Sequence, residues 1–262
     1  MPFGTILTQT RRRWTGGLIA GVLAVVTLAW SAGPASADVA PGNVAYEGRL
    51  VFVRLRYDMA RSLAGGFFRQ DVKWAHDYPR AERNLTKILE AVTNVNPFQG
   101  PNGGNVLALD DPELHKFPFA YMSEPGFWFP TDAEVVGLRN YMLKGGFVIF
   151  DDFWGNHWRN FEAQLQRVLP DARPLPMELT HPVFQSFFEI ETLEMPGPYG
   201  PPVEFWGVFE DNDPAGRLMA IVNFNNDIGE YWEFSDSGWY PIDLTNEAYK
   251  FGVNYVVYAL TH

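Results

Sequence analysis

The sequence predicts an α/β protein, in which helices cover both faces of a mostly parallel β-sheet. From residue 50 onward, short runs of β-branched and aromatic residues alternate with segments of helical periodicity, and the connections between them are short. This order is typical of right-handed βαβ units, whose strands pair in parallel. Hydrophobic residues make up 47% of the chain, which is enough for one sizeable core and does not force a second domain.

The first predicted elements are a strand and a helix. The strand is expected at 51–55, VFVRL, and the helix begins after Asp77-Tyr78-Pro79. The apolar residues that recur at the spacing of one helix face are Leu85, Ile88, Leu89 and Val92. Two further strands are predicted at 105–109 and 117–122, and prolines in the second one leave its length open.

The clearest helix signal lies in the middle of the chain. Thr131 and Glu134 have the spacing of a capping box, in which each side chain bonds the backbone N–H of the other residue. Lys144, followed by two glycines, supplies a cation and then a left-handed stop. The sequence therefore predicts a helix between these two signals.

A strand and a further helix follow this one. The strand, 147–150, is apolar and runs into two adjacent carboxylates, Asp151 and Asp152. Aromatic and aliphatic residues that share one face predict a helix near 156–169. The strand and helix alternation is complete at this point.

After Pro170 the pattern changes. A proline-rich stretch precedes two β-like runs, at 203–209 and 217–224. Thr245 opens a terminal helix that is apolar nearly all round from 251 to 260. A helix of this kind is expected to pack inside the core. The prediction is thus a β-rich C-terminal region closed by an apolar helix.

Residues 1–37 have the pattern of a secretory signal peptide. Three arginines at 11–13 precede an apolar run over about residues 18–30, and Ala35-Ser36-Ala37 matches an A-x-A cleavage pattern. The run is shorter than the roughly 20 apolar residues that span a bilayer. The paired arginines, with Trp14 close behind, are similar to a twin-arginine export signal, and an ordinary arginine-rich signal peptide is the alternative.

Cleavage near Ala37 predicts a periplasmic or extracellular protein without a transmembrane span. We expect a linker at 38–49 and a single α/β domain at 50–262. Removing residues 1–37 removes three arginines and no acid, so the net charge changes from −11 to −14. Such a surface repels phosphate backbones, and nucleic acid is not an expected partner. The absence of cysteine excludes disulfides, thiolate metal sites and cysteine nucleophiles.

Several stretches together resemble the exported bacterial proteins of the domain-of-unknown-function 4159 family. They are FVRLRY at 52–57, DPEL at 111–114, LRNYMLKGGF at 138–147 leading to Asp151 and Asp152, HPVF at 181–184, AYKFGVNY at 248–255 and YALT at 258–261. The resemblance covers nearly all of the chain after the signal peptide. It implies a flavodoxin-like fold similar to class I glutamine amidotransferases, and an association with MoxR-type ATPases and von Willebrand-type domain proteins.

The resemblance does not imply amidotransferase chemistry. Those enzymes place a cysteine at a tight turn between a strand and a helix, whereas the comparable residues here, 121–126, read YMSEPG. The sequence also lacks a GxSxG elbow and an HExxH zinc motif. The resemblance therefore predicts a fold more than a function.

Candidate binding residues follow the carboxyl ends of the predicted strands, where open parallel sheets bind ligands. They are Arg54, Arg56, Ser123, Glu124, Trp128, Asp151, Asp152, Asn226, Asp227, Glu230 and Trp232. Side chains alternate along an extended strand, so only one of Asp151 and Asp152 should face the crevice, and we expect Asp152. In the structural alternative, Asp151 caps the next helix and Asp152 pairs with Arg54 or Arg56.

Three functional hypotheses remain. The first is a non-catalytic domain that binds an envelope protein or glycan through the crevice and the aromatic loops 124–130 and 223–233, although these aromatics could equally be core. The second is a metal-dependent hydrolase of envelope carbohydrate, with Asp152, Glu124 and His157 as acid, base or ligands. No cofactor is predicted, although two carboxylates could hold Mg²⁺ or Ca²⁺. A purely structural subunit is the third, weaker hypothesis.

Overall fold

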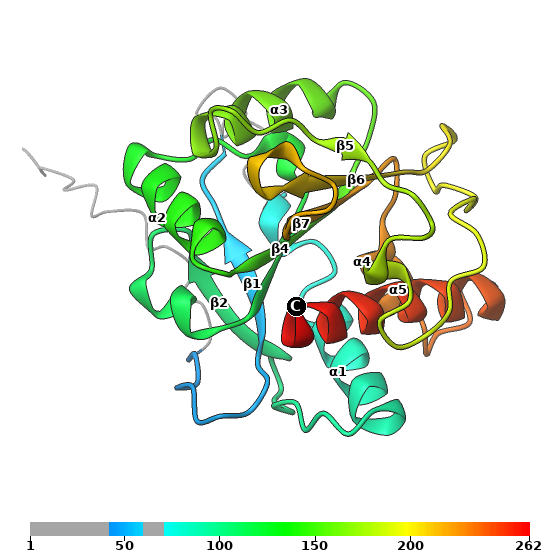
Figure 1. Ribbon diagram of the computed structural model, residues 1–262. Coiled ribbons are helices and arrows are strands. Elements are labelled where there is room, and N and C mark those ends of the chain that lie inside the picture. Colours follow the sequence, from blue (N-terminus) through cyan, green and yellow to red (C-terminus); the bar gives the residue numbers. More distant parts are fainter. Residues whose placement is uncertain (1–41, 60–70) are drawn as a thin grey trace, which may run out of the picture. The chain divides into compact units, whose positions relative to one another are not determined.

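The computed structural model describes residues 42–59 and 71–262, which form a seven-stranded sheet with flanking helices (Figure 1). The strands lie in the order β2-β1-β3-β4-β7-β6-β5. Their bounds are β1 Phe52–Arg56, β2 Gly104–Ala108, β3 Phe119–Ser123, β4 Phe147–Phe153, β5 Leu175–Pro176, β6 Glu204–Phe209 and β7 Leu218–Phe224. The predicted signal peptide lies outside the described residues.

The central strands of the sheet are parallel, as the sequence predicts. β1 pairs with β2 and β3, β3 pairs with β4, and β4 pairs with β7, all in parallel. β6 and β5 extend the sheet beyond β7 through antiparallel pairs. The order β2-β1-β3-β4-β7 is that of a flavodoxin-like fold, in which ligands bind beyond the carboxyl ends of the strands. The predicted fold class is confirmed.

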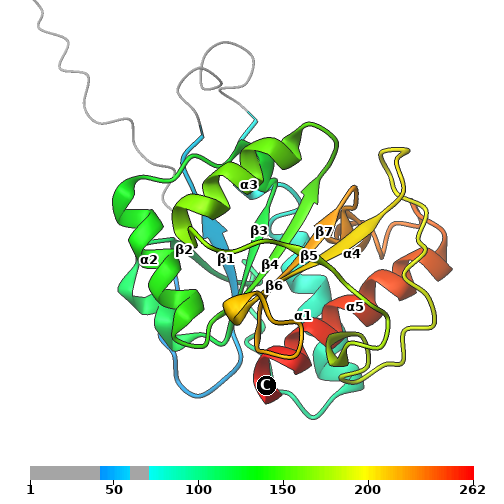
Figure 2. The ribbon, with the colours of Figure 1, turned by 45° about the horizontal axis from the view of Figure 1, so that its top comes forward.

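Helices cover both faces of this sheet (Figures 1 and 2). The helices α1 (Arg80–Val92), α4 (Ile228–Glu233) and α5 (Ile242–Thr261) pack on one face, and α2 (Asp132–Leu143) and α3 (His157–Val168) pack on the other. Short 3-10 turns lie at Lys73–Ala75, Pro112–Lys116, Pro125–Phe127, Pro182–Phe184 and Glu210–Asn212. The described residues thus form three layers around two apolar cores.

The central strand β4 contributes to both cores. Phe147 and Ile149 point toward the face covered by α5, whereas Val148 and Phe150 point toward α2 and α3. All four side chains are buried. A strand that is covered on both faces needs apolar residues at every position, which explains the uninterrupted apolar run in the sequence.

Helix α2 begins at the capping box that the sequence predicts. The Glu134 N–H donates to Thr131 Oγ1 at 3.2 Å, and the Thr131 N–H donates to Glu134 Oε2 at 2.8 Å. After the helix, Gly145 adopts a φ of 108°, which a residue with a Cβ would adopt only with strain. Both predicted ends of this helix are confirmed.

Two C-terminal elements differ from the prediction. Helix α5 begins at Ile242, directly after Pro241, and not at Thr245. Residues 228–233 form the helix α4 instead of an aromatic binding loop. Trp232 is fully buried there, and its Nε1–H donates to the Ala248 carbonyl at 2.9 Å. The open alternative for these aromatics is resolved in favour of the core, because α4 fills the gap between α1 and α5.

The described part of the expected linker, 42–49, lies against the edge strand β2. The side-chain amide of Asn43 exchanges two hydrogen bonds of 2.9 Å with the backbone of Val106. The side-chain amide of Asn105 exchanges hydrogen bonds of 2.8 and 2.9 Å with the backbone of Val44. These contacts attach the segment to the sheet.

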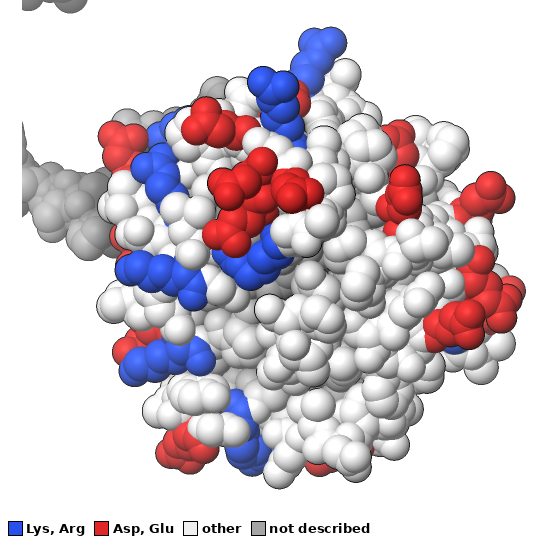
Figure 3. All heavy atoms as spheres, viewed as in Figure 1, with Lys and Arg blue, Asp and Glu red and all other residues white. Residues whose placement is uncertain are grey.

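Charges of both signs are spread over the surface of the described residues. Figure 3 shows one face, on which acidic and basic side chains lie next to one another in several places, a wide area is uncharged, and the basic side chains form no continuous surface. Within residues 42–59 and 71–262, none of the helices combines the length and the hydropathy needed to cross a membrane.

The capping box should contribute measurably to stability. We expect Thr131→Ala to lower the free energy of unfolding by about 1 kcal/mol, because the Glu134 N–H loses its acceptor. Urea denaturation of the two proteins measures the difference. Thr131→Ser keeps the hydroxyl and should retain most of the stability, and equal losses in both variants would contradict the role of the cap.

Candidate functional site

A β-bulge at the end of β4 determines where the two adjacent carboxylates point. The register between β4 and β7 shifts between Phe150 and Phe153, and Asp152 adopts a left-handed φ of 61°. Phe150 and Phe153 both contact Phe161, each with ring centroids 5.0 Å apart, so they face the same side of the sheet. The strand is not extended at this point as expected, because the bulge interrupts the alternation of side chains between the two faces at Asp152.

Asp151 is fully buried near the carboxyl end of β4 and has a structural role. Its carboxylate accepts hydrogen bonds from Tyr121 Oη at 2.8 Å, the Gly229 N–H at 3.0 Å and Asn223 Nδ2 at 3.1 Å. Burial raises the pKa of Asp151 to about 6, although these hydrogen bonds oppose the shift. Asp151 does bond a helix N-terminus, as the structural alternative expected, but the helix is α4 and not α3.

Asp152 is the carboxylate on which several side chains converge near the carboxyl ends of the strands. Its Oδ2 accepts from Ser123 Oγ at 3.1 Å and lies 3.5 Å from His76 Nδ1, and its Oδ1 accepts from Tyr199 Oη at 2.6 Å. The side chain is only 2% exposed. The expected pairing of Asp152 with an arginine does not occur, because its neighbours are hydroxyls, an imidazole and other carboxylates.

One group of acidic and basic side chains lies on the β3 side of Asp152. Glu124 Oε1 lies 2.9 Å from both His76 Nδ1 and Lys73 Nζ, and Asp71 bonds His76 Nε2 at 2.6 Å. Burial alone would lower the pKa of His76, but hydrogen bonds to Asp152, Glu124 and Asp71 raise it to about 11. This side of the site is therefore balanced by two cations, although Glu124 Oε2 is buried without a hydrogen-bond partner.

A second group, on the β7 side, consists of carboxylates alone. Asp77, Asp152 and Asp227 each offer one oxygen, and the three oxygens lie within 4.8 Å of one another. Burial, and then the charge of Asp152, raise the pKa values of Asp77 and Asp227 well above the usual range. Asp77 Oδ2 is buried and has no hydrogen-bond partner. The charge of Arg54 opposes the pKa shift of Asp77, but neither Asp77 nor Asp227 forms a salt bridge among the described residues.

Backbone strain is concentrated at the same place. Asp77, Glu124, Asp152 and Asn225 all have positive φ values, of 64°, 49°, 61° and 58°. A non-glycine residue in this region costs on the order of 1–3 kcal/mol unless side-chain hydrogen bonds offset it. Such strain often accompanies functional sites, because selection for stability alone would remove it.

Arg54, a candidate binding residue, is part of the scaffold below the site. It is fully buried, and its Nε donates to the Glu82 carboxylate. Its Nη1 donates to the carbonyls of Trp74 at 3.0 Å and His76 at 2.7 Å. Arg54 therefore positions the segment that carries His76 and Asp77, and its assignment as a ligand residue is wrong. Arg56 is partly buried and takes part in none of these contacts.

Two aromatic candidates cannot bind a ligand in this structure. Trp128 is fully buried and stacks on Phe150 with ring centroids 6.0 Å apart, and Trp232 is equally buried under α5. Both side chains fill the cores on which the crevice rests. The hypothesis of exposed aromatic loops at 124–130 and 223–233 is therefore wrong for these two residues.

The remaining candidates divide between the site and its surroundings. Asn226 is buried, and its Oδ1 accepts from the Asp227 N–H at 3.0 Å. Glu230 is partly buried and accepts from Tyr240 Oη at 2.5 Å. His157 lies between the rings of Phe127 and Trp154, with centroids 4.6 and 4.5 Å away, and belongs to neither carboxylate group.

His76, and not the predicted His157, is the histidine that lies beside Glu124 and Asp152. Together with Asp77, it lies just before α1, about 20 residues after the end of the predicted strand at 51–55. The only sequence signal was the helix start at Asp77-Tyr78-Pro79, which indicates a turn and says nothing of a site. Tertiary contacts of Arg54 place both residues, and those contacts are not visible in the sequence.

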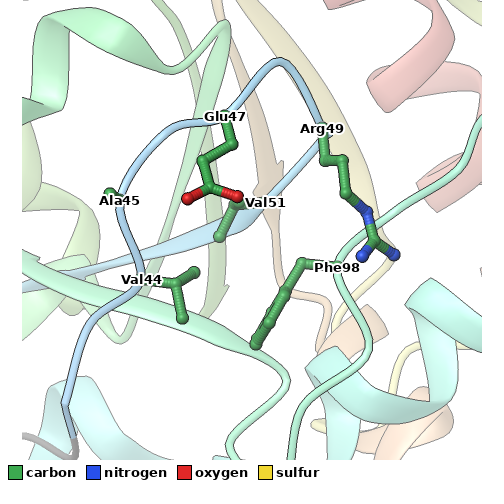
Figure 4. Close-up of a pocket in the computed structure, with 6 residues that line it drawn as sticks. All are labelled: Val44, Ala45, Glu47, Arg49, Val51 and Phe98. Atoms are coloured by element: carbon green, nitrogen blue, oxygen red, sulfur yellow. The ribbon is translucent and has the colours of Figure 1, made fainter.

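A separate cavity of about 290 Å³ lies at the amino end of β1 (Figure 4). Its lining residues are Val44, Ala45, Glu47, Arg49, Val51 and Phe98. Arg49 is hydrogen-bonded to the neighbouring loop, because its Nη2 donates to Asn96 Oδ1 and to the Pro97 carbonyl. This cavity lies at the opposite end of β1 from the carboxylates and offers few polar groups to a ligand.

The buried ion pair of Arg54 and Glu82 should dominate the stability of the scaffold. We expect Arg54→Met to lower the free energy of unfolding by about 3–5 kcal/mol, because Glu82 is left as an uncompensated buried charge. Urea denaturation of the single variants and of Arg54→Met combined with Glu82→Leu measures the coupling. The double variant should lose less than the sum of the single losses, and additive losses would contradict the pairing.

Sequence comparison identifies the family of the chain. The family described as "Domain of unknown function (DUF4159)" matches residues 51–260, a range that runs from β1 almost to the end of α5 and includes both carboxylate groups. No curated protein matches the sequence. Because the match covers most of the chain, this protein belongs to the DUF4159 family.

Proposed function

We propose that the protein is an exported binding protein of the cell envelope, periplasmic or extracellular. In this proposal, the crevice at the carboxyl ends of β1, β3, β4 and β7 binds a divalent cation and, with it, a polar glycan or protein partner. The observation that supports the proposal is the group of buried carboxylate oxygens from Asp77, Asp152 and Asp227, which lie within 4.8 Å of one another.

The charge of this group favours a cation. Three buried carboxylates repel one another strongly where water is excluded, and only protonation or a bound positive charge relieves the repulsion. Mg²⁺ and Ca²⁺ take carboxylate oxygens at about 2.0–2.6 Å, so oxygens separated by 4.8 Å or less can bind one ion. A cation would replace the protons that Asp77 and Asp227 otherwise retain.

The backbone of α4 passes close to Asp77. Its buried Oδ2 faces Gly229, and a Cβ added at Gly229 would lie 2.7 Å from this oxygen and 2.5 Å from Tyr121 Oη. A larger residue at this position would therefore clash with the oxygen of Asp77 that lacks a hydrogen-bond partner. The group on the β3 side is a weaker candidate, because its Glu124 and His76 are already paired with Lys73 and Asp71.

Hydrolysis is the second candidate function, and one observation favours it. His76, Glu124 and Asp152 meet within 4.8 Å, beside the carboxylates that would hold the cation. A cation can activate water there, and the neighbouring acids and imidazole can transfer protons. This version of the carbohydrate hydrolase hypothesis uses His76 in place of His157.

Cation binding should be visible as thermal stabilisation. With Mg²⁺ or Ca²⁺ at 100 times its dissociation constant, we expect about 2.7 kcal/mol of added stability, or roughly 5–10 °C in Tm. Differential scanning calorimetry of the chelator-treated protein, with and without each metal, measures the shift. Asp152→Asn should abolish it, whereas Asp58→Asn, which removes an exposed carboxylate after β1, should leave it unchanged.

Two further variants distinguish the carboxylate groups. Asp227→Asn keeps the side-chain oxygen that caps α4 but removes a charge, and it should abolish the shift. Glu124→Gln should preserve it. The reverse pattern would place the cation between His76 and Glu124, and a shift that survives Asp152→Asn would contradict a site in the crevice.

A turnover assay separates binding from hydrolysis. If the protein is a hydrolase, release of reducing ends from purified cell-wall glycan should require the cation and should disappear in both Asp152→Asn and His76→Gln. If the protein only binds, wild type should release no more than Asp152→Asn. Activity that persists in both variants would show that the crevice is not the reaction centre.

A further inference from the structure

Tyr199 reaches the carboxylates from a long connection that contains no helix or strand. The connection, 191–203, lies wholly within the described residues and has a single turn at 198–199. It is attached to the domain by side chains: Asn225 Nδ2 donates to the Pro202 carbonyl at 3.0 Å, and Leu193, Met195 and Val203 pack against the core. Local opening around Tyr199 breaks no strand pairing of the sheet.

The side chain of Tyr199 makes two specific contacts in the crevice. Its ring stacks on Trp154, with centroids 3.9 Å apart and planes inclined by 23°. Its hydroxyl lies 2.6 Å from Asp152 Oδ1 and 3.0 Å from Asp227 Oδ2. The ring of Tyr199 thus contacts an aromatic side chain, and its hydroxyl oxygen contacts two carboxylates.

The two carboxylates do not match the hydrogen-bonding capacity of a tyrosine side chain. A phenol carries a single hydroxyl proton and can donate it to only one carboxylate at a time. The facing oxygen of the other carboxylate then receives no proton from Tyr199 unless that carboxylate is itself protonated, although the second oxygen of Asp152 accepts from Ser123 Oγ and that of Asp227 accepts from the Glu230 N–H. A buried oxygen that is left without its own donor is costly. Asp152 and Asp227 would be better satisfied by two neighbouring hydroxyl groups, one for each.

A pyranose ring of a glycan supplies these groups. Its C–H bonds can pack against the face of an aromatic ring, whose electron density is negative, and its vicinal hydroxyls can donate to two separate carboxylates. An aromatic side chain of a partner protein would offer only one donor and would repeat the mismatch of Tyr199. The same hydroxyl oxygens can also join the coordination of a hard cation.

We propose that Trp154, Asp152 and Asp227 form a subsite for a vicinal diol of a sugar ring, and that Tyr199 is an internal competitor for it. The inference rests on the proposed function, since it uses the same crevice and selects a glycan as the partner. Withdrawal of the connection 191–203 is therefore a requirement for binding. Removal of the Tyr199 side chain should raise the affinity, because the sugar no longer competes with an intramolecular occupant.

The test uses small probes of defined chemistry. Methyl α-D-glucopyranoside and methyl α-D-mannopyranoside present trans and cis diols, and p-cresol represents a tyrosine side chain of a protein partner. Isothermal titration and saturation-transfer NMR would compare wild type, Tyr199→Gly, and Tyr199→Gly combined with Trp154→Ala. Thermal transitions of the three proteins verify that each is folded.

We expect Tyr199→Gly to bind at least one glycoside at least tenfold more tightly than wild type, and the added Trp154→Ala to abolish the gain. Tyr199→Phe keeps the stacked ring and should give a smaller gain. Equal affinities in wild type and Tyr199→Gly, binding that survives Trp154→Ala, or no glycoside bound by folded Tyr199→Gly would each overturn the inference. Preference for p-cresol over both glycosides would overturn it in favour of a protein partner.

A parallel metal titration keeps this inference separate from the proposed function. Cation binding without glycoside binding by Tyr199→Gly would overturn the sugar subsite alone. Glycoside binding without any cation effect would support the subsite and would refute the cation. Absence of both would refute the two proposals together.

Discussion

Several buried carboxylates lie close together at the carboxyl ends of the strands, and the surrounding structure has to compensate their mutual repulsion. Repulsion between such groups is much stronger in a protein interior than in water. On one side, Lys73 and His76 neutralise Glu124. On the other side, Asp77 and Asp227 form no salt bridge among the described residues, and burial, together with the charge of Asp152, raises their pKa values. The charge of Arg54 offsets only part of this shift at Asp77.

The scaffold below these groups is held by an ion pair and several hydrogen bonds, although Arg54 Nη2 and Glu82 Oε2 are buried without a partner. Asp151 receives three hydrogen bonds, and Arg54 holds both Glu82 and the backbone before α1. The left-handed backbone at Asp152 and Glu124 is imposed by strands that are buried on both faces. Rigid support of this kind keeps like charges close together, and a site that must capture a charged or hydroxylated ligand needs that arrangement.

The sequence predicted the fold better than it predicted the site. Periodicity and the capping box at Thr131 sufficed for the parallel sheet and most helices, because these signals are local. The position of Asp152 was also expected, since it follows a buried strand. Three other features could not be predicted: the bulge at Asp152, the contacts of His76 and the contacts of Tyr199. They depend on contacts between residues 47 to 76 positions apart. Trp128 and Trp232 were ambiguous because aromatic residues serve cores and binding surfaces alike.

The attachment of Asn43 and Val44 to β2 limits how this protein can assemble. An exposed sheet edge is a template for strands from other molecules and promotes aggregation. Here side-chain amides occupy the outer backbone groups of Val106, and the opposite edge strand, β5, has two residues and ends at Pro176, which has no N–H to donate. Self-association by strand addition is therefore disfavoured at both edges of the sheet.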